Sequence, residues 1–412
     1  MWRWRVAACA MGVLAIAAPV SLSAQAPTSI STQTLDDPVE RPRLRLGPVG
    51  LTPSIALTNF GIDTNVFNEF EDPKSDFTFT VSPQLDARLR AGTWRLRVAA
   101  RSDMVYFQQY TSERSIDGVF DSRLERRAAR LMPWFSAAAA NGRQRFGYEI
   151  DLRFQRDVRD VAAGVDVRVA GKTRVGVSAR RISYTHDPDA EFSGSSLRDA
   201  LDRRTDALAV QFQYALTPLT TFVVSGERAF DRFEFTPARD ADSSRVDAGF
   251  DLLPFALIAG RGRVGYRRFT GTGGALPSYS GLVASVAASS TIGGQTRIEV
   301  AVDRDVSYSW EVLYPYYLRT GATVTVTPQI TTRWDVRGRL GTQRLAYRAA
   351  AGVPAARQDR VDRLGLMGAG VGYRLGHDVR IGVGLDWERR ETPVLRHAYE
   401  GYRTGVSVTY GR

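Results

Sequence analysis

The chain of 412 residues contains a single cysteine, Cys9, and after its first segment it contains no run of 18 apolar residues. The absence of later cysteines excludes disulfides and thiolate chemistry from the rest of the chain. The absence of a long apolar run excludes a transmembrane helix, which needs about 20 residues. A membrane location would therefore require β-strands.

Residues 1–24 have the features of a secretory signal peptide. Arg3 and Arg5 form a basic start, an apolar run of about 15 residues follows, and small residues surround Ala24. The run is too short for a membrane anchor, so we expect cleavage after Ala24. Residues 25–50 are rich in proline and charge and lack periodicity. They predict a flexible periplasmic lead.

The segment QTRIEVAVDRDVSY (295–308) alternates apolar residues such as Ile298, Val300 and Val302 with polar ones such as Arg297 and Glu299. Alternation with period 2 predicts a strand with one apolar and one polar face. The same pattern returns throughout 51–412 and predicts about 18 strands, with 16 as the alternative. Their approximate bounds are 51–67, 76–91, 93–107, 118–139, 145–157, 160–169, 173–185, 204–216, 219–231, 244–254, 256–269, 279–291, 295–308, 314–327, 331–347, 358–375, 378–391 and 400–411.

The connections between these strands mostly alternate between tight turns and longer polar loops. This alternation favours an antiparallel up-and-down barrel with turns at one end and loops at the other. Most predicted strands also exceed the five or six residues usual in soluble proteins.

Aromatic residues gather near both ends of the predicted strands, as in the interfacial girdles of membrane barrels. The residues near turns are Trp94, Trp134, Phe222, Phe255, Trp334 and Tyr410, and those near loops are Tyr106, Tyr184, Phe230, Tyr266, Tyr308, Trp310, Tyr314 and Trp387. The sequence thus predicts an all-β, transmembrane, antiparallel outer-membrane β-barrel over 51–412. A periplasmic all-β protein is the alternative.

The chain also resembles a known group, the "putative β-barrel porin" family found with exopolysaccharide and capsule genes. The resemblance lies in Asp63-Thr64-Asn65-Val66-Phe67, Ser75-Asp76 and Val81-Ser82-Pro83 of segment 46–89, and in YALTPLTTFVVSGE (214–227). It implies a bacterial outer-membrane barrel associated with extracellular polysaccharide.

No arrangement of residues indicates catalysis. His186 and His397 are expected at outer loops and His377 in a periplasmic turn, and none has an evident serine partner. The acidic loop segments lack the ordered spacing of an EF-hand. We therefore expect no enzyme, no metal site and no cofactor.

The polar faces of the predicted strands are rich in charge. Inward-facing arginines are predicted at Arg95, Arg97, Arg101, Arg261, Arg263, Arg267, Arg319, Arg333, Arg337 and Arg339, with acidic partners at Glu227, Asp247, Asp251, Glu299 and Asp303. These charges allow two interpretations, and the two are compatible with each other. The arginines would give a conduit that prefers anions, or cross-strand ion-pair ladders would fill the lumen.

The segment AEFSGSSLRDALDRR (190–204) predicts one helical turn, in a surface loop or in an inward constriction.

The sequence thus predicts a porin-like passive conduit with a basic lumen. The resemblance adds a link to polysaccharide export. The alternative is a non-conducting structural or glycan-binding barrel filled by salt-bridge ladders. The expected partners are outer-membrane lipid, the barrel-insertion machinery and anionic polysaccharide, with no nucleic acid.

Overall fold

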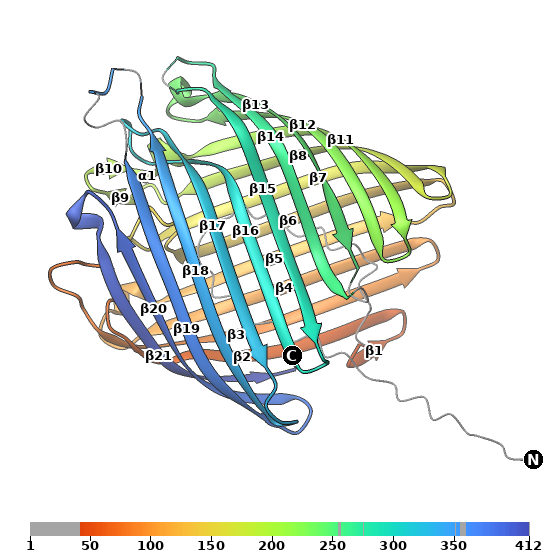
Figure 1. The fold of residues 1–412 in the computed structure, drawn as a ribbon, viewed down its shortest axis with the longest axis horizontal. Helices are drawn as coiled ribbons and strands as arrows, with labels where there is room; N and C mark the ends of the chain where they lie inside the picture. The colour runs from red at the N-terminus through yellow and green to blue at the C-terminus, as the bar shows by residue number, and fades with distance from the viewer. Residues whose placement is uncertain (1–41, 254–256, 275, 351, 355–359, 412) are drawn as a thin grey trace, which may run out of the picture.

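The computed structural model describes residues 42–253, 257–274, 276–350, 352–354 and 360–411. Within these residues the chain forms one closed antiparallel barrel of 18 long strands (Figure 1). The predicted signal peptide, residues 1–24, and most of the predicted lead lie outside the described residues.

The strands of the wall are β2 to β8 and β11 to β21. Their bounds are β2 Val49–Asp63, β3 Asp76–Ala91, β4 Trp94–Phe107, β5 Ser115–Arg126, β6 Leu131–Gln144, β7 Phe154–Ala170, β8 Thr173–His186, β11 Arg203–Thr217, β12 Thr220–Phe233, β13 Ala241–Leu252, β14 Ile258–Gly271, β15 Tyr279–Ile292, β16 Thr296–Tyr308, β17 Tyr316–Pro328, β18 Trp334–Arg348, β19 Val361–Leu375, β20 Val379–Glu391 and β21 Tyr399–Tyr410. Sequence neighbours pair along the wall, and β2 pairs with both β3 and β21, which closes the barrel. A closed wall leaves no open edge of unpaired backbone in lipid.

The smaller elements lie at the ends of the barrel. Strand β1 (Leu44–Leu46) pairs with the start of β2, so residues 44–46 are a strand and not part of a flexible lead. Strands β9 (Glu191–Phe192) and β10 (Ser195–Ser196) and helix α1 (Leu197–Leu201) lie in the β8–β11 loop. The 3₁₀ turns are η1 (Thr111–Glu113), η2 (Pro237–Arg239) and η4 (Leu395–His397). No helix in the described part of the chain is both long and apolar enough to cross a bilayer.

The two faces of the wall follow from the register, because side chains alternate along a strand and directly paired residues share a face. Leu208 lies opposite Arg228, Val246 opposite Gly226 and Val264 opposite Ala248 on one continuous face. This face carries the exposed apolar side chains, including Leu282 and Leu340. It is the lipid-facing surface, and the alternate positions point into the lumen.

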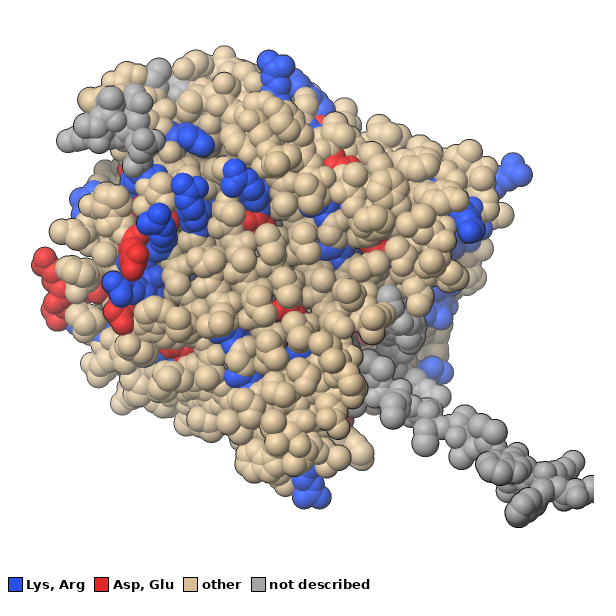
Figure 2. Space-filling view, in the orientation of Figure 1, with Lys and Arg blue, Asp and Glu red and all other residues tan. Residues whose placement is uncertain are grey.

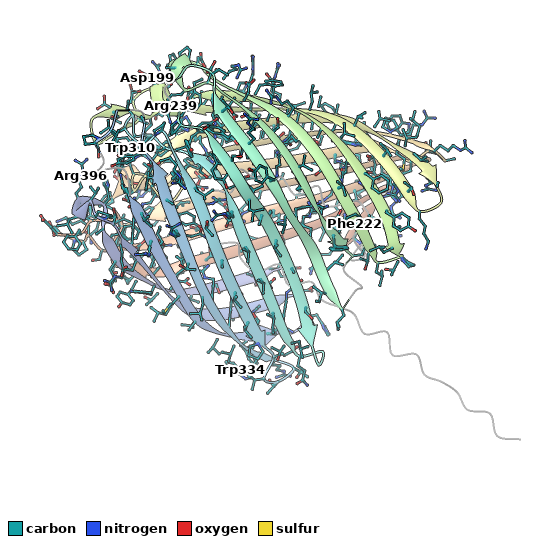
Figure 3. The ribbon with its side chains drawn as sticks, turned by 45° about the horizontal axis from the view of Figure 1, so that its top comes forward. Asp199, Phe222, Arg239, Trp310, Trp334 and Arg396 are labelled. Carbon is teal, nitrogen blue, oxygen red and sulfur yellow. The ribbon has the colours of Figure 1, made fainter. Side chains whose placement is uncertain are left out.

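Shorter and longer connections alternate around the barrel, and the sequence predicts most of this alternation. Trp334 and Phe222 mark the end with short turns, here called the turn end (Figure 3). Trp310, Arg239 and Arg396 mark the opposite, loop end. Both ends of the wall in sequence, the start of β2 and the end of β21, lie at the turn end.

The sequence predicts the number of wall strands correctly but divides 118–169 wrongly. The predicted strand 118–139 is two strands, β5 and β6, and Asn141-Gly142 lies within β6 and forms no turn. The predicted strand 145–157 is mostly the β6–β7 loop, and the predicted strand 160–169 is the main part of β7. The two errors cancel in the count.

Candidate functional site

The register places nine of the ten predicted arginines on the inward face. Arg261 and Arg263 of β14 lie opposite Asp251 and Gly249 of β13, and Arg337 and Arg339 of β18 lie opposite Gly370 and Gly368 of β19. The others are Arg95, Arg97, Arg101, Arg267 and Arg319. Arg333 lies in the turn between β17 and β18 and is exposed, because β18 begins at Trp334, later than predicted.

Most of these arginines have carboxylate partners on the inward face. The ion pairs are Arg97–Asp86 at 3.6 Å, Arg101–Asp103 at 2.8 Å, Arg263–Asp251 at 2.7 Å, Arg267–Asp305 at 2.8 Å, Arg319–Asp303 at 2.7 Å and Arg339–Asp386 at 2.9 Å. Asp247 accepts from Ser225 at 2.7 Å and lies 4.0 Å from Arg263. The lumen wall is therefore held by ion pairs, several of which cross between strands.

The remaining predicted acids are placed differently. Glu299 pairs with Arg297 of its own strand at 2.9 Å. Glu227 lies opposite Arg245 in the register. Sequence reasoning missed Asp63, which pairs with Arg403 at 2.8 Å, and Asp335, which accepts from Arg380 at 2.9 Å.

The missed acids could have been found from one signal in the sequence. Each lies on the polar face of its strand, and a neighbouring strand has an arginine on the same face. Asp305 also lies on the predicted polar face of 295–308, where it binds Arg245 at 3.1 Å as well as Arg267.

A cavity of about 430 Å³ lies inside the wall between β2–β5 and β17–β21. Seven arginines and five carboxylates line it, which makes its lining basic. They are Arg101, Arg145, Arg153, Arg337, Arg339, Arg380 and Arg403, with Asp63, Asp103, Asp117, Asp386 and Glu388. Among the described residues, Arg337 has no carboxylate within 4.0 Å and no hydrogen-bond partner. Its guanidinium is therefore available to a solute in the cavity, whereas Arg145, which also lacks an ion pair among the described residues, is held by the carbonyls of Asp151 and Val66.

Glycines on the inward face of β19 and β20 make room for these long side chains. A Cβ added at Gly368 would lie 2.3 Å from Asp386 Oδ1, and one at Gly372 would lie 2.1 Å from Arg380 Nη2. Both distances are far below van der Waals contact. The glycines therefore allow charged side chains to lie flat along the wall.

The β6–β7 loop (145–153), here called the inner loop, closes over the loop end of this cavity. Arg145 and Arg153, at its two ends, both line the cavity. Arg153 Nη1 donates to Glu113 O at 2.6 Å. Arg145 Nε donates to Asp151 O at 2.6 Å, and its Nη2 donates to Val66 O. The inner loop is thus tied to the β2–β3 and β4–β5 loops, which precede it along the wall.

The middle of the inner loop is buried against strands from the far side of the wall. Glu149 is 3% exposed and accepts from the hydroxyl of Ser309. Burial raises the pKa of Glu149 to about 8, and burial raises the pKa of Asp151 to about 6. Arg390 of β20 donates to Glu149 O at 3.0 Å and to Asp151 Oδ2 at 3.1 Å.

Arg390 is the centre of a buried ion network. It also donates to Asp362 at 2.7 Å, and both side chains are fully buried. Arg360 donates to the same Asp362 at 3.1 Å and to Glu311. The network ties the inner loop to the β16–β17 and β18–β19 loops.

Apolar packing completes this cover, which we call the cap: the inner loop, α1 and residues 309–315. Ile150, Leu197, Leu201 and Trp310 are buried in one cluster with Phe154. Arg239 of η2 donates to Ala200 O at 2.6 Å and Pro315 O at 2.9 Å, and therefore joins α1 to residues 309–315 (Figure 3). The predicted helical turn exists, with Ser196 as its N-cap, and its leucines face the cap.

The β16–β17 hairpin bends into the lumen at the loop end. Pairing of β15 with β16 ends at Ala284–Arg304, whereas β16 pairs with β17 as far as Tyr308–Tyr316. The Tyr308 ring lies 4.9 Å from that of Phe233, and its hydroxyl donates to Asp231 at 2.8 Å.

Part of the predicted girdle is wrong, because the inward bend carries Tyr308, Trp310 and Tyr314 inside and the register places Tyr184 of β8 and Trp134 of β6 on the inward face. Tyr308, Trp310, Tyr314 and Tyr184 lie in the interior of the loop end and not at the lipid interface. Phe255 lies outside the described residues.

Two of the three histidines, which the sequence predicts in outer loops, are buried and not at the surface. His186 is 4% exposed, and its Nδ1 lies 2.6 Å from Asp202. His397 is 5% exposed at the edge of the cap, where burial lowers its pKa to about 4. His377 is exposed in the β19–β20 turn.

Comparison with known proteins gives one family and several solved structures. The family model described as "Putative beta-barrel porin 2" matches residues 37–412. No curated protein matches the chain in sequence. A BenF-like porin from Pseudomonas fluorescens Pf-5 is 10% identical, with 89% of this chain and 98% of that chain covered and a TM-score of 0.48. The outer membrane protein OpdK from Pseudomonas aeruginosa is 10% identical, with 87% and 98% covered and a TM-score of 0.48.

Proposed function

We propose that this chain, which belongs to the family Putative beta-barrel porin 2 and lies in the bacterial outer membrane, is a passive conduit whose basic lumen favours anions. A barrel of 18 strands lies within the range of 16 to 18 strands at which porin barrels leave an aqueous channel. Charged groups along such a lumen set its ion selectivity.

The single observation that carries anion preference is Arg337. Paired arginines contribute little net field, because a carboxylate neutralises each of them locally. Arg337 lines the cavity without such a partner, and Arg339 and Arg380 lie on the same wall. Its charge acts on solutes in the lumen without local neutralisation.

The link to extracellular polysaccharide rests on the family resemblance in segment 46–89. An acidic polysaccharide presents carboxylates or phosphates to the basic cavity lining, and guanidinium groups bind both well. We therefore propose acidic saccharide as the solute class.

Planar-bilayer recordings test the conduit. In a salt gradient, the wild type should conduct steadily with a reversal potential that indicates anion preference. Arg337→Gln should reduce that preference, because it removes the unpaired lumen charge.

The matched control is Arg333→Gln, which removes an exposed arginine four residues away in the turn. It should leave selectivity unchanged. Equal effects of the two variants would contradict the role of Arg337, and the absence of any current would contradict the conduit itself.

The cap favours a second candidate, a barrel that does not conduct. The inner loop is fixed by Arg390 and Ser309, and the ion pairs fill part of the lumen. In that case the barrel would serve as a structural or glycan-binding protein. A protein without current, in which replacement of the inner loop produces current, would support this candidate.

A further inference from the structure

The lipid-facing side of the barrel carries a basic cluster near the loop end. Arg344 of β18 lies directly opposite Arg363 of β19, and both side chains are exposed. Arg304 of β16 lies in the same register row, two strands from Arg344, with Thr320 of β17 between them. Figure 2 shows basic side chains gathered over the loop-end parts of β16 to β20, above a broad surface with few charges.

The position of this cluster along the barrel axis matches a membrane–water interface. Trp334 and Arg344 lie on the same face of β18, ten residues apart, with Leu340 exposed between them. At a rise of ~3.3 Å per residue and a tilt of ~40°, ten residues span ~25 Å, the height of the apolar band of outer-membrane barrels. With Trp334 at one interface, Arg344 and Arg363 lie at the headgroups of the other.

Among the described residues, the pair of Arg344 and Arg363 has no partner. Neither Arg344 nor Arg363 has a hydrogen bond or ion pair with any described residue. Glu391 lies opposite Arg363 in the register, but its carboxylate pairs with Arg389 at 3.4 Å. Like charges directly opposite in a sheet are destabilising, so a bridging anion would relieve the pair.

We propose that Arg344 and Arg363 bind a phosphate group of a lipid headgroup in the outer leaflet. Guanidinium groups match phosphate oxygens with paired hydrogen bonds, and two facing guanidiniums can share one phosphate. The apolar surface beside the pair, formed by Leu340, Met367 and Leu385, is exposed and suits the acyl chains of the same lipid. This inference needs only the barrel in its membrane and holds whether or not the lumen conducts.

Native mass spectrometry of the detergent-purified protein with lipid A tests the proposal. The wild type should retain lipid A and lose it when both phosphates are removed enzymatically from the lipid. Arg344→Gln/Arg363→Gln should weaken retention about tenfold or more, since two charge-assisted contacts are lost.

The matched control is Arg268→Gln. Arg268 is also exposed on the lipid-facing side, but its direct register neighbours are Ser244 and Ser280, so no second arginine lies opposite it. This variant should retain lipid A like the wild type. Inorganic phosphate alone should not compete, which separates a lipid site from a free-anion site.

Equal retention of lipid A by the double variant and the Arg268→Gln control would overturn the proposal. So would equal retention of the phosphorylated and dephosphorylated lipid by the wild type, a comparison that requires no variant to fold.

Discussion

At the scale of single residues, the buried charges of the cap distinguish this barrel from one with an uncovered lumen. Removing charges from water is costly, and the cost is offset only when hydrogen bonds and opposite charges surround them. Arg390 meets this condition through Asp362, Asp151 and the carbonyl of Glu149. Such groups hold one arrangement of the loops firmly and make it sensitive to the loss of any partner.

Arg390→Met should destabilise the folded protein by about 3–5 kcal/mol, because Asp362 would keep a buried charge with fewer partners. Thermal unfolding in detergent measures this. Arg389→Met is the matched control, because Arg389 is the preceding residue and is exposed. Equal melting temperatures for the two variants would argue against a central role for Arg390.

Glu149 should make the docking of the inner loop dependent on pH. Burial raises its pKa from 4.5 to about 8, so the docked loop holds the proton more tightly than an undocked, solvated loop. Protonated Glu149 therefore stabilises the docked inner loop fully below pH ~4.5, and this stabilisation is lost as the pH rises toward 8. The neighbours Ser309, Glu311, Arg360 and Arg390 modify this shift, with Glu311 in the raising direction and the other three in the lowering direction.

The measurement is single-channel current from pH 5 to 9 in wild type and Glu149→Gln. Opening events should become more frequent with rising pH in the wild type, and the variant should show a flatter profile. A profile that Glu149→Gln leaves unchanged would assign the pH dependence to another group.

At the scale of elements, the long loops differ in what they cover. Glu149 and Ile150 of the inner loop and Ser309 and Trp310 of the β16–β17 loop are buried, whereas the part of the β2–β3 loop at 70–73 is exposed. The β16–β17 hairpin leaves the wall and adds its own aromatic side chains to the interior. The cap is therefore built from a few specific loops and one bent hairpin.

Replacing residues 146–152 with glycine and serine of equal length should increase conductance, because it removes Tyr148, Glu149 and Ile150 from the cap while the strands stay intact. Bilayer recording measures the change. The same replacement at 70–73, which is exposed, should leave conductance as in the wild type. Unchanged conductance in the first variant would mean that the inner loop does not limit flow.

At the scale of the whole molecule, closure between β2 and β21 completes the barrel. The register shifts between Leu57 and Phe60, and Asn59 has a φ of 53°. Gly61 then lies so close to β21 that an added Cβ would be 2.0 Å from Thr404 O. This position of the closing seam therefore requires glycine.

Gly61→Ala should destabilise the closed barrel by about 1–3 kcal/mol, the usual cost of forcing extra atoms into a packed site. Thermal unfolding and the yield of folded barrel measure this effect. Gly118→Ala is the control, since a Cβ there would meet nothing within 4 Å. A loss of the same size in both variants would point to a general cost of removing strand glycines.

The sequence by itself determined the class of fold and predicted the inward face of nine of the ten arginines, whereas its strand count is right only because two errors cancel. Period-2 alternation and turn chemistry are local properties, and lipid outside the wall enforces them along nearly every strand. The same rule failed at 145–155, where an alternating segment forms the inner loop. There the apolar residues pack in the cap, and Glu149 and Asp151 bond to Ser309 and Arg390. The alternating apolar and polar side chains therefore all find suitable surroundings without forming a strand.

The tertiary structure alone decided the cap, the bent β16–β17 hairpin and the ion pairs. Each depends on which strands meet around the closed wall, and on residues such as Glu149 and Ser309 that lie 160 positions apart in sequence. Whether an arginine stays unpaired, as Arg337 does, depends on the neighbours supplied by that closure. Such contacts arise between elements that no local pattern connects, so they are fixed only when the barrel closes.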